Sequence, residues 1–196
     1  MRIALIRHGL TVGNLYKAYV GRPDQPLCAE GKADLESKRE NAGYPQMDVI
    51  YASSMTRCVQ TAKICYPNKP IVEFPELRER DFGRFEGMNH KEITAQPGHE
   101  HWGKTPESMV FPGGEDWDAF AARSQTGFLR AVERTKNGGR GSMAVICHGG
   151  TIMAVMERFV DPGKSRYEWA CAPGRGFVIL FDNRSKSGKL SRRICP

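Results

Sequence analysis

The sequence lacks a long apolar segment. No run of 18 apolar residues occurs among its 196 residues, so we expect no membrane-spanning helix and no membrane partner. Met1 and Arg2 lead directly into a short apolar run, without the successive charged, apolar and small-residue regions of a signal peptide. These absences predict a soluble, cytoplasmic protein.

Cysteine-based scaffolds are also missing. The six cysteines form no Cys-x-x-Cys pair and no disulfide-dense cluster, which favours reduced thiols in a cytosolic compartment. His90, His99 and His101 are close in sequence, but no cysteine or carboxylate accompanies them at ligand spacing. We therefore expect a metal-independent protein without a cofactor, in which these histidines line a pocket or lie on the surface.

Several phosphate-handling motifs are absent. No cysteine has an arginine six residues on, as the loop of a cysteine-based phosphatase requires. The triplet Gly163-Lys164-Ser165 lacks the upstream glycine of a P-loop, and no Gly-x-Gly-x-x-Gly opens a helix after a strand. An Asp-x-Asp occurs at 116–118, but it falls in a predicted amphipathic helix instead of at the end of an apolar strand. These observations argue against nucleotide-cradling loops and against an aspartate nucleophile.

The composition is that of a globular protein with an excess of positive charge. Hydrophobic residues make up 40% and charged residues 26%, so residues 1–196 fit a single domain. The net charge of +7 is compatible with an acidic substrate, a nucleic acid or a solvated basic exterior. The longest basic cluster, 184–193, has no interleaved aromatic, so we expect a solvated face and no nucleic-acid partner. Monomer and homodimer both remain open.

Two apolar runs each end in a histidine. Residues 3–6 lead into Arg7, His8 and a glycine, and residues 143–147 lead into His148 and two glycines. Unbroken apolar runs of this length are typical of strands buried on both faces of a parallel sheet, whose carboxyl ends carry the functional groups of open α/β folds. If the two strands are neighbours, both imidazoles meet at one edge of the sheet.

Strands alternate with helices along the chain. This order predicts an α/β three-layer sandwich, in which helices flank a mainly parallel central sheet. Strands are expected at 3–6, 48–52, 71–74, 143–147 and 177–181, with an edge strand at 190–194. Helices are expected at 29–42, closed by Gly43, at 55–66, capped by Ser53 and Ser54, and at 89–96, 115–136 and 151–159. Residues 77–87 are expected to form a loop.

Five motifs in a fixed order carry a family resemblance. They are Arg-His-Gly-x-Thr-x-x-Asn at 7–14, Ser-Ser-Met-Thr-Arg at 53–57 where a strand leads into a helix, Leu-x-Glu-x-x-x-Gly at 77–83, Pro-Gly-Gly-Glu at 112–115 and His-Gly-Gly at 148–150. In these motifs the chain resembles the histidine phosphatase superfamily, in its phosphoglycerate mutase-like branch, over essentially its whole length. Two positions depart from the pattern: Leu10, where many relatives have glutamate, and Cys28, where threonine is the usual helix cap.

The resemblance implies a role for each motif residue. His8 would be the nucleophile of a phosphohistidine mechanism, which suits an imidazole that is partly neutral at pH 7. Glu79 would be the general acid, although Glu76, Asp81 and Glu86 stand close by in the same loop. Arginine forks suit the oxygens of a phosphoryl group. The implied phosphoryl-binding residues are Arg7, Asn14, Arg57, Gly149 and a cationic His148, of which Arg7, Arg57 and His148 also assist catalysis.

The short span between Glu79 and His148 favours a phosphatase, because cofactor-dependent mutases of this branch are longer there. The segment from Leu77 to Gly87 most resembles small bacterial phosphatases of the α-ribazole phosphatase type. We therefore expect a phosphomonoesterase acting on a small phosphorylated metabolite, with α-ribazole 5′-phosphate as a candidate. A phosphoglycerate mutase and a non-catalytic phospho-ligand binding protein remain alternatives. Residues 85–114, with His99, His101 and Trp102, are expected to form a lid that sets substrate specificity.

Overall fold

The computed structural model describes residues 1–41, 43–97 and 110–195, which fold around one six-stranded sheet. The strand order is β3-β2-β4-β1-β5-β6. Strands β1 to β4 run parallel, whereas β5 is antiparallel to both β1 and β6. The strands are β1 (Arg2–Arg7), β2 (Val49–Ser53), β3 (Ile71–Phe74), β4 (Ser142–Cys147), β5 (Gly176–Asp182) and β6 (Ser187–Ile194). The predicted α/β sandwich with a mainly parallel sheet is confirmed.

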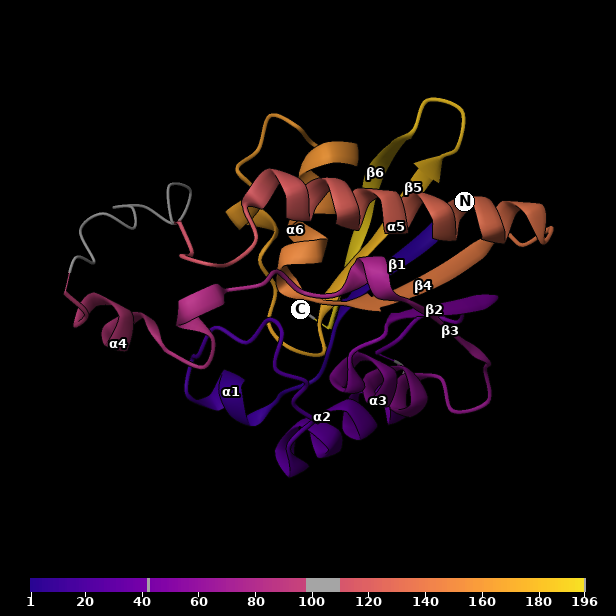
Figure 1. Ribbon diagram of the computed structural model, residues 1–196. Coiled ribbons are helices and arrows are strands. Elements are labelled where there is room, and N and C mark those ends of the chain that lie inside the picture. Colours follow the sequence, from indigo (N-terminus) through magenta and orange to yellow (C-terminus); the bar gives the residue numbers. More distant parts are fainter. Residues whose placement is uncertain (42, 98–109, 196) are drawn as a thin grey trace.

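Helices cover both faces of the sheet. Figure 1 shows α5 and α6 on one face and α2 and α3 on the other, with α1 and α4 to one side. The α-helices are α1 (Val12–Leu15), α2 (Ala29–Glu40), α3 (Thr56–Cys65), α4 (His90–Thr94), α5 (Trp117–Asn137) and α6 (Gly149–Phe159). Short 3₁₀ turns are η1 (Pro75–Leu77), η2 (Gly83–Phe85) and η5 (Arg166–Trp169). Among the described residues, no helix is long and apolar enough to cross a membrane.

The apolar runs of the sequence are strands buried on both faces. In β1, Ile3 and Leu5 pack in the core beneath α5 and α6, while Ala4 and Ile6 pack in the core against α2 and α3. Successive side chains of a strand point to opposite faces, so a strand covered on both sides needs an apolar residue at every position. This explains why the first strand could be predicted from its lack of a polar break.

Several helix ends differ from prediction. The structure begins α3 at Thr56 and places Ser53 in β2, so the prediction of a cap from Ser53 and Ser54 is wrong. Instead, the Asp24 carboxylate accepts hydrogen bonds from the Thr56 amide and hydroxyl, each at 2.7 Å. The cap of α3 therefore comes from a loop distant in sequence. Helix α2 ends at Glu40, before the predicted end at residue 42.

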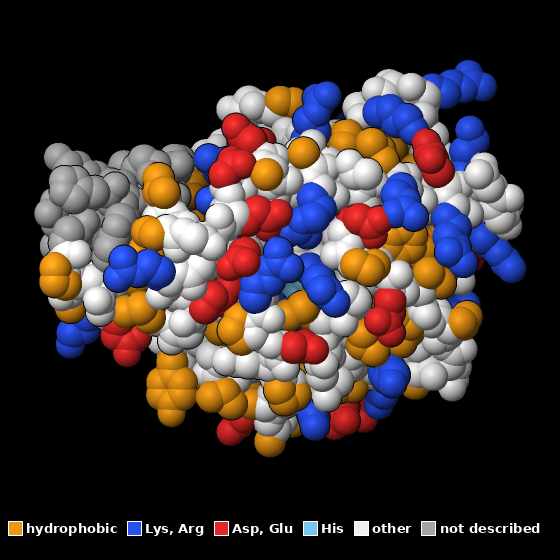
Figure 2. Space-filling model, in the orientation of Figure 1, with side chains coloured by type: hydrophobic (Ala, Val, Ile, Leu, Met, Phe, Trp, Pro, Cys, Tyr) orange, Lys and Arg blue, Asp and Glu red, His pale blue; other side chains and the backbone are white. Residues whose placement is uncertain are grey.

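Charge is mixed over the surface. On the face shown in Figure 2, Lys and Arg side chains lie among Asp and Glu side chains instead of forming one stripe. The predicted basic segment 184–193 covers the turn that joins β5 to β6 and most of β6 itself. Most side chains of β6 are exposed, as expected of a solvated edge strand. All six cysteines are free thiols.

Candidate active site

The sheet topology brings the two strand-end histidines together. Strands β1 and β4 are parallel neighbours in which Arg7 pairs with Cys147, and the His8 amide donates to the Cys147 carbonyl at 2.9 Å. The next residue of each strand is therefore a histidine at the same edge. The rings of His8 and His148 lie 5.3 Å apart between centroids, nearly edge to face. The predicted juxtaposition is confirmed.

His8 is held as a neutral imidazole with one defined free nitrogen. Its Nδ1 lies 2.7 Å from the Gly9 carbonyl oxygen, and because a carbonyl can only accept, Nδ1 carries the hydrogen. Burial and the nearby guanidinium groups of Arg7 and Arg57 hold the pKa of His8 well below its usual value. Its Nε2 therefore keeps a lone pair at neutral pH. Only 4% of His8 is exposed, and that surface faces a cavity of about 460 Å³.

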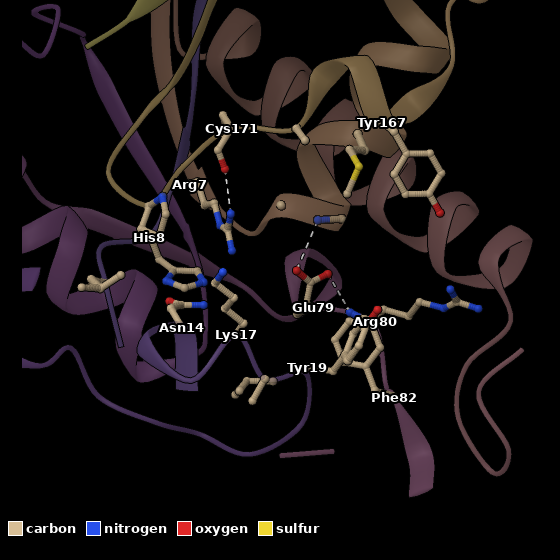
Figure 3. Close-up of a pocket in the computed structure, with 18 of the residues that line it drawn as sticks. Arg7, His8, Asn14, Lys17, Tyr19, Glu79, Arg80, Phe82, Tyr167 and Cys171 are labelled. Carbon is tan, nitrogen blue, oxygen red and sulfur yellow. Dashed lines mark hydrogen bonds between the residues drawn. The ribbon is translucent and has the colours of Figure 1, made fainter. Parts of the chain in front are cut away.

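Around His8 the cavity forms an anion-binding end, which we call the phosphoryl end. Figure 3 shows the side chains of Arg7, Asn14 and Lys17 converging beside the His8 ring. Arg7 donates from Nη1 to the Cys171 carbonyl at 2.7 Å, but its buried Nε has no hydrogen-bond partner among the described residues. A buried N–H of a cation normally has an acceptor. The orphaned donor therefore suits an oxygen of an anionic ligand.

Two further donors face the same end. The Asn14 Oδ1 accepts hydrogen bonds from the Thr11 amide and hydroxyl, both at 3.1 Å, which leaves the Asn14 amide nitrogen free to donate into the cavity. Gly149 lines the cavity as the first residue of α6. The first amides of a helix have no partner within the helix and lie at its positive end, where they attract anions. Asn14 and Gly149 thus line the same cavity as His8.

Glu79 is the acidic residue of its loop that lines the cavity. It is 8% exposed and accepts hydrogen bonds from the Arg80 amide at 2.9 Å and the Gly150 amide at 3.2 Å. Burial raises its pKa, against the lowering effect of those amides and of Arg57 and Arg7. The carboxyl group is therefore more easily protonated than an exposed glutamate.

The neighbouring carboxylates have structural partners. Glu86 accepts from three backbone amides, those of Gly21, Arg22 and Phe82, at 2.8–2.9 Å. Asp81 pairs with the Arg22 side chain and accepts from the Gly83 amide, and Glu76 pairs with Arg130. These contacts distinguish the three carboxylates from Glu79, because none of the three lines the cavity.

Arg57 and His148 lie behind the cavity instead of lining it. The Arg57 guanidinium donates to the carbonyl oxygens of Pro23, Val20 and Gly21 at 3.1–3.3 Å, and its Nε donates to His148 Nδ1 at 3.3 Å. These four bonds leave one of the two Nη1 hydrogens unused. Neither side chain lines the cavity in this structure, and their contact with a phosphoryl group stays a prediction.

The predicted cationic state of His148 is wrong here. Burial, Arg57 and His8 hold the pKa of His148 well below its usual value, and the side chain is fully buried. Its Nδ1 accepts from Arg57, so its Nε2 carries the hydrogen and donates to the Ser53 hydroxyl at 2.9 Å. This neutral ring packs beside His8 and orients Arg57.

The opposite end of the cavity is aromatic and was not predicted. Rings of Tyr19, Phe82 and Phe111 contact one another with centroids 4.9–5.5 Å apart, and the Arg80 guanidinium lies 4.5 Å from the Phe111 ring centre. In Figure 3, Glu79 lies between this aromatic end and the phosphoryl end. The side chains that form the aromatic end are Tyr19, Arg80, Phe82, Phe111, Trp117, Met153 and Tyr167.

Some of the cavity residues that were not predicted had a signal in the sequence, and others had none. Phe111 and Trp117 flank the Pro-Gly-Gly-Glu motif at 112–115, so their closeness to a motif was available as a signal. Tyr167 lies in η5, a turn that no motif or periodicity indicated. Lys17 follows the first motif but lies outside its pattern.

The predicted lid, residues 85–114, lies only partly within the described residues. His99, His101 and Trp102 lie outside the described residues, so their predicted contacts with the leaving group stay predictions. His90 begins α4 and is exposed. Among residues 1–41, 43–97 and 110–195, no group of three or more histidine, cysteine or carboxylate side chains is placed to hold a metal ion.

Comparison with known proteins identifies relatives of two activities. The 2,3-bisphosphoglycerate-dependent phosphoglycerate mutase 2 of Gloeobacter violaceus is 29% identical over 162 residues, which cover 79% of this chain and 73% of that protein. The adenosylcobalamin/alpha-ribazole phosphatase of Escherichia coli is 25% identical over 164 residues, covering 82% and 79%. Mutases and phosphatases are thus both among the relatives.

Solved structures share the fold. The alpha-ribazole phosphatase from Shigella flexneri superposes with a TM-score of 0.82 at 23% identity, covering 99% of this chain and 96% of that one. A phosphoglycerate mutase from Bacillus anthracis superposes with a TM-score of 0.79 at 19% identity, covering 97% and 91%. The model of the histidine phosphatase superfamily (branch 1) matches residues 3–187, which include both strand-end histidines and the loop of Glu79. The chain therefore belongs to the histidine phosphatase superfamily.

Proposed function

We propose that this protein is a phosphomonoesterase that hydrolyses a small phosphorylated metabolite through a phosphohistidine at His8. The observation that carries the proposal is the pairing of His8 with Glu79 in one cavity. The imidazole is held neutral and the carboxyl group is more easily protonated than usual, which is the state that a nucleophile and a general acid need.

In the first step, His8 Nε2 attacks phosphorus and the bond from phosphorus to the leaving-group oxygen breaks. The Glu79 carboxyl group gives its proton to that oxygen, so the product alcohol leaves neutral. Arg7, Asn14 and the Gly149 amide donate to the phosphoryl oxygens, which carry negative charge throughout. The phosphate dianion itself would raise the pKa of Glu79 further and favour the acid form.

In the second step, water attacks the phosphorus of the phosphohistidine. Glu79, now a carboxylate, accepts a proton from that water, the bond from phosphorus to Nε2 breaks, and inorganic phosphate and neutral His8 are regenerated. Arg57 and His148 act from behind the cavity wall in this account. Arg57 contributes to the low pKa of His8, and His148 orients Arg57.

The aromatic end supports a leaving group that carries a flat ring. Stacked side chains such as Tyr19 and Phe111 offer apolar contact without a fixed set of polar partners. α-Ribazole 5′-phosphate, which the printed name of the E. coli relative suggests, fits this chemistry. We further propose that residues 1–196 form one domain in which residues 85–114 cover the leaving group as a lid.

A substrate panel tests the phosphatase against its alternatives. The protein and its His8→Ala variant are incubated with α-ribazole 5′-phosphate, 4-nitrophenyl phosphate and 3-phosphoglycerate, the last with and without 2,3-bisphosphoglycerate. The proposal predicts that the wild-type chain releases inorganic phosphate and that His8→Ala does not. The wild-type chain should hydrolyse the aromatic esters faster than 3-phosphoglycerate.

The other outcomes separate the remaining functions. Isomerisation of 3-phosphoglycerate that depends on the bisphosphate, without phosphate release, would identify a mutase, the activity printed for the Gloeobacter relative. Binding of phosphate without any turnover would identify a phospho-ligand binding protein. Equal turnover by His8→Ala would rule out the phosphohistidine route.

A further inference from the structure

Lys17 occupies a backbone position that favours glycine. It follows α1 with a φ of 54°, in the left-handed region that side chains with a Cβ adopt at a cost in free energy. Its amide donates to the Asn14 carbonyl at 3.1 Å, and the Ala18 amide donates to the Gly13 carbonyl at 2.9 Å. These two bonds form a Schellman motif, in which glycine is the usual residue at the place of Lys17. A lysine at this place therefore costs free energy that a glycine would not.

That side chain is directed into the cavity. Lys17 lines the cavity wall, and Figure 3 shows its chain running toward the His8 ring and the Arg7 guanidinium. With the residues that the structure describes, the Lys17 ammonium makes neither an ion pair nor a hydrogen bond. A cation directed at a second cation without an acidic partner indicates a place for an anion.

The charge at the phosphoryl end is incomplete without Lys17. Three basic side chains line the cavity among the described residues: Arg7, Lys17 and Arg80. Arg80 belongs to the aromatic end, where its guanidinium stacks on Phe111 and its Nε donates to the Glu115 carbonyl at 2.7 Å. Arg57 directs its N–H groups at loop carbonyls and His148. Among the described residues that line the cavity, Arg7 and Lys17 are therefore the basic side chains beside His8 that can share the charge of a dianion.

We propose that Lys17 is a phosphate-binding residue, which supplies the second cation for the phosphoryl dianion at His8. The inference rests on the proposed function, because it assumes that a phosphomonoester binds in the cavity. It adds a binding residue outside the motifs of the sequence, placed by the left-handed turn after α1.

Glycine at this position separates the binding role from a structural one. Lys17→Gly removes the charge and relieves the backbone, so the melting temperature should rise by a few degrees. Inorganic phosphate is the probe, and its dissociation constant is measured by calorimetric titration. We expect phosphate to bind about tenfold more weakly to Lys17→Gly, because a charge-assisted hydrogen bond is lost. Lys17→Met, which keeps the length of the side chain, should weaken binding to a similar extent.

Lys186 offers a matched control. It is a second lysine with a left-handed backbone, at a φ of 52°, but it lies in the turn between β5 and β6 and pairs with Glu133 on α5. Lys186→Gly should leave the affinity for phosphate unchanged. Phosphate binding by Lys17→Gly or Lys17→Met within twofold of the wild-type value would overturn the proposal.

The phosphate titration and the turnover assay test the two proposals independently. If the wild-type chain hydrolyses phosphomonoesters and the Lys17 variants bind phosphate normally, the proposal for Lys17 fails and the proposed function stands. If no phosphomonoester is hydrolysed but the Lys17 variants lose phosphate affinity, the proposed function fails and the phosphate-binding role stands.

Discussion

Two titratable residues on the wall of one cavity are shifted in opposite directions. Burial disfavours the charged form of each, so it lowers the pKa of His8 and raises the pKa of Glu79. Arg7 and Arg57 reinforce the shift of His8 but oppose the shift of Glu79. The neutral forms of both residues are the reactive forms in the first step of the proposed mechanism. The same desolvation therefore prepares the nucleophile and the acid together.

The pH dependence of kcat/KM follows from these signs. Activity should fall at low pH as His8 gains a proton, and this fall should lie below the usual histidine range because the pKa is lowered. Activity should fall again as the pH rises through the raised pKa of Glu79, since the general acid is then ionised. The resulting optimum is acidic. The check is a pH–rate profile with an alkyl phosphomonoester such as glycerol 1-phosphate, whose leaving oxygen needs a proton.

Glu79→Gln provides the control for the high-pH limb. A glutamine cannot ionise, and 4-nitrophenolate leaves without a proton, so formation of the phosphoenzyme from 4-nitrophenyl phosphate by this variant should show no decline at high pH. The low-pH limb from His8 should remain. A high-pH decline in Glu79→Gln with 4-nitrophenyl phosphate would mean that a group other than Glu79 causes the high-pH limb.

At the scale of elements, a carboxylate ties together the two loops that shape the cavity. Glu86 holds the backbone amides of Gly21 and Arg22 from one loop and that of Phe82 from the other. The first loop also carries Tyr19 and presents the carbonyl oxygens that Arg57 requires. One side chain therefore fixes both the aromatic end and the partners of Arg57.

Removal of this tie should affect stability and binding together. Glu86→Ala leaves three amides without their acceptor and should lower the free energy of unfolding by about 2–4 kcal/mol. The KM for an aromatic phosphomonoester should rise, because Tyr19 is no longer held. Urea unfolding and steady-state kinetics measure the two effects.

Glu133→Ala is the matched control, because Glu133 is an exposed carboxylate whose contact with Lys186 is 3.9 Å long. Its free energy of unfolding should change by less than about 0.5 kcal/mol. If Glu86→Ala matched this control in both measurements, the two loops would be held by other contacts.

At the scale of the whole molecule, the fold was more predictable than the cavity wall. The unbroken apolar run before His8 predicts a strand covered on both faces, and a similar run predicts the strand before His148. The orientation of side chains was harder to predict from the sequence. The partners of Arg57 come from Val20, Gly21 and Pro23, in a loop whose path no periodicity encodes. Tyr167 reaches the cavity from a 3₁₀ turn that lacks a sequence signature.

The positions of the site residues in the fold also explain why the proposed chemistry could be predicted from the sequence, whereas the substrate could not. His8, Glu79 and Gly149 are placed by strand and helix ends or by motif loops, and all three lie within the residues that the family model matches. The aromatic end is built from side chains of five separate segments, around Tyr19, Phe82, Phe111, Met153 and Tyr167. Their meeting depends on tertiary packing, which the spacing of residues does not record.

The phosphoenzyme tests the central claim most directly. Glu79→Gln is mixed with 4-nitrophenyl phosphate and quenched in alkali, which preserves phosphohistidine, and the phosphate is located by peptide mass analysis. The first step needs no acid with this leaving group and the second lacks its base, so about one phosphate per chain should accumulate on His8. His8→Ala should carry none. Phosphate on a residue other than His8, or wild-type turnover by His8→Ala, would contradict the account.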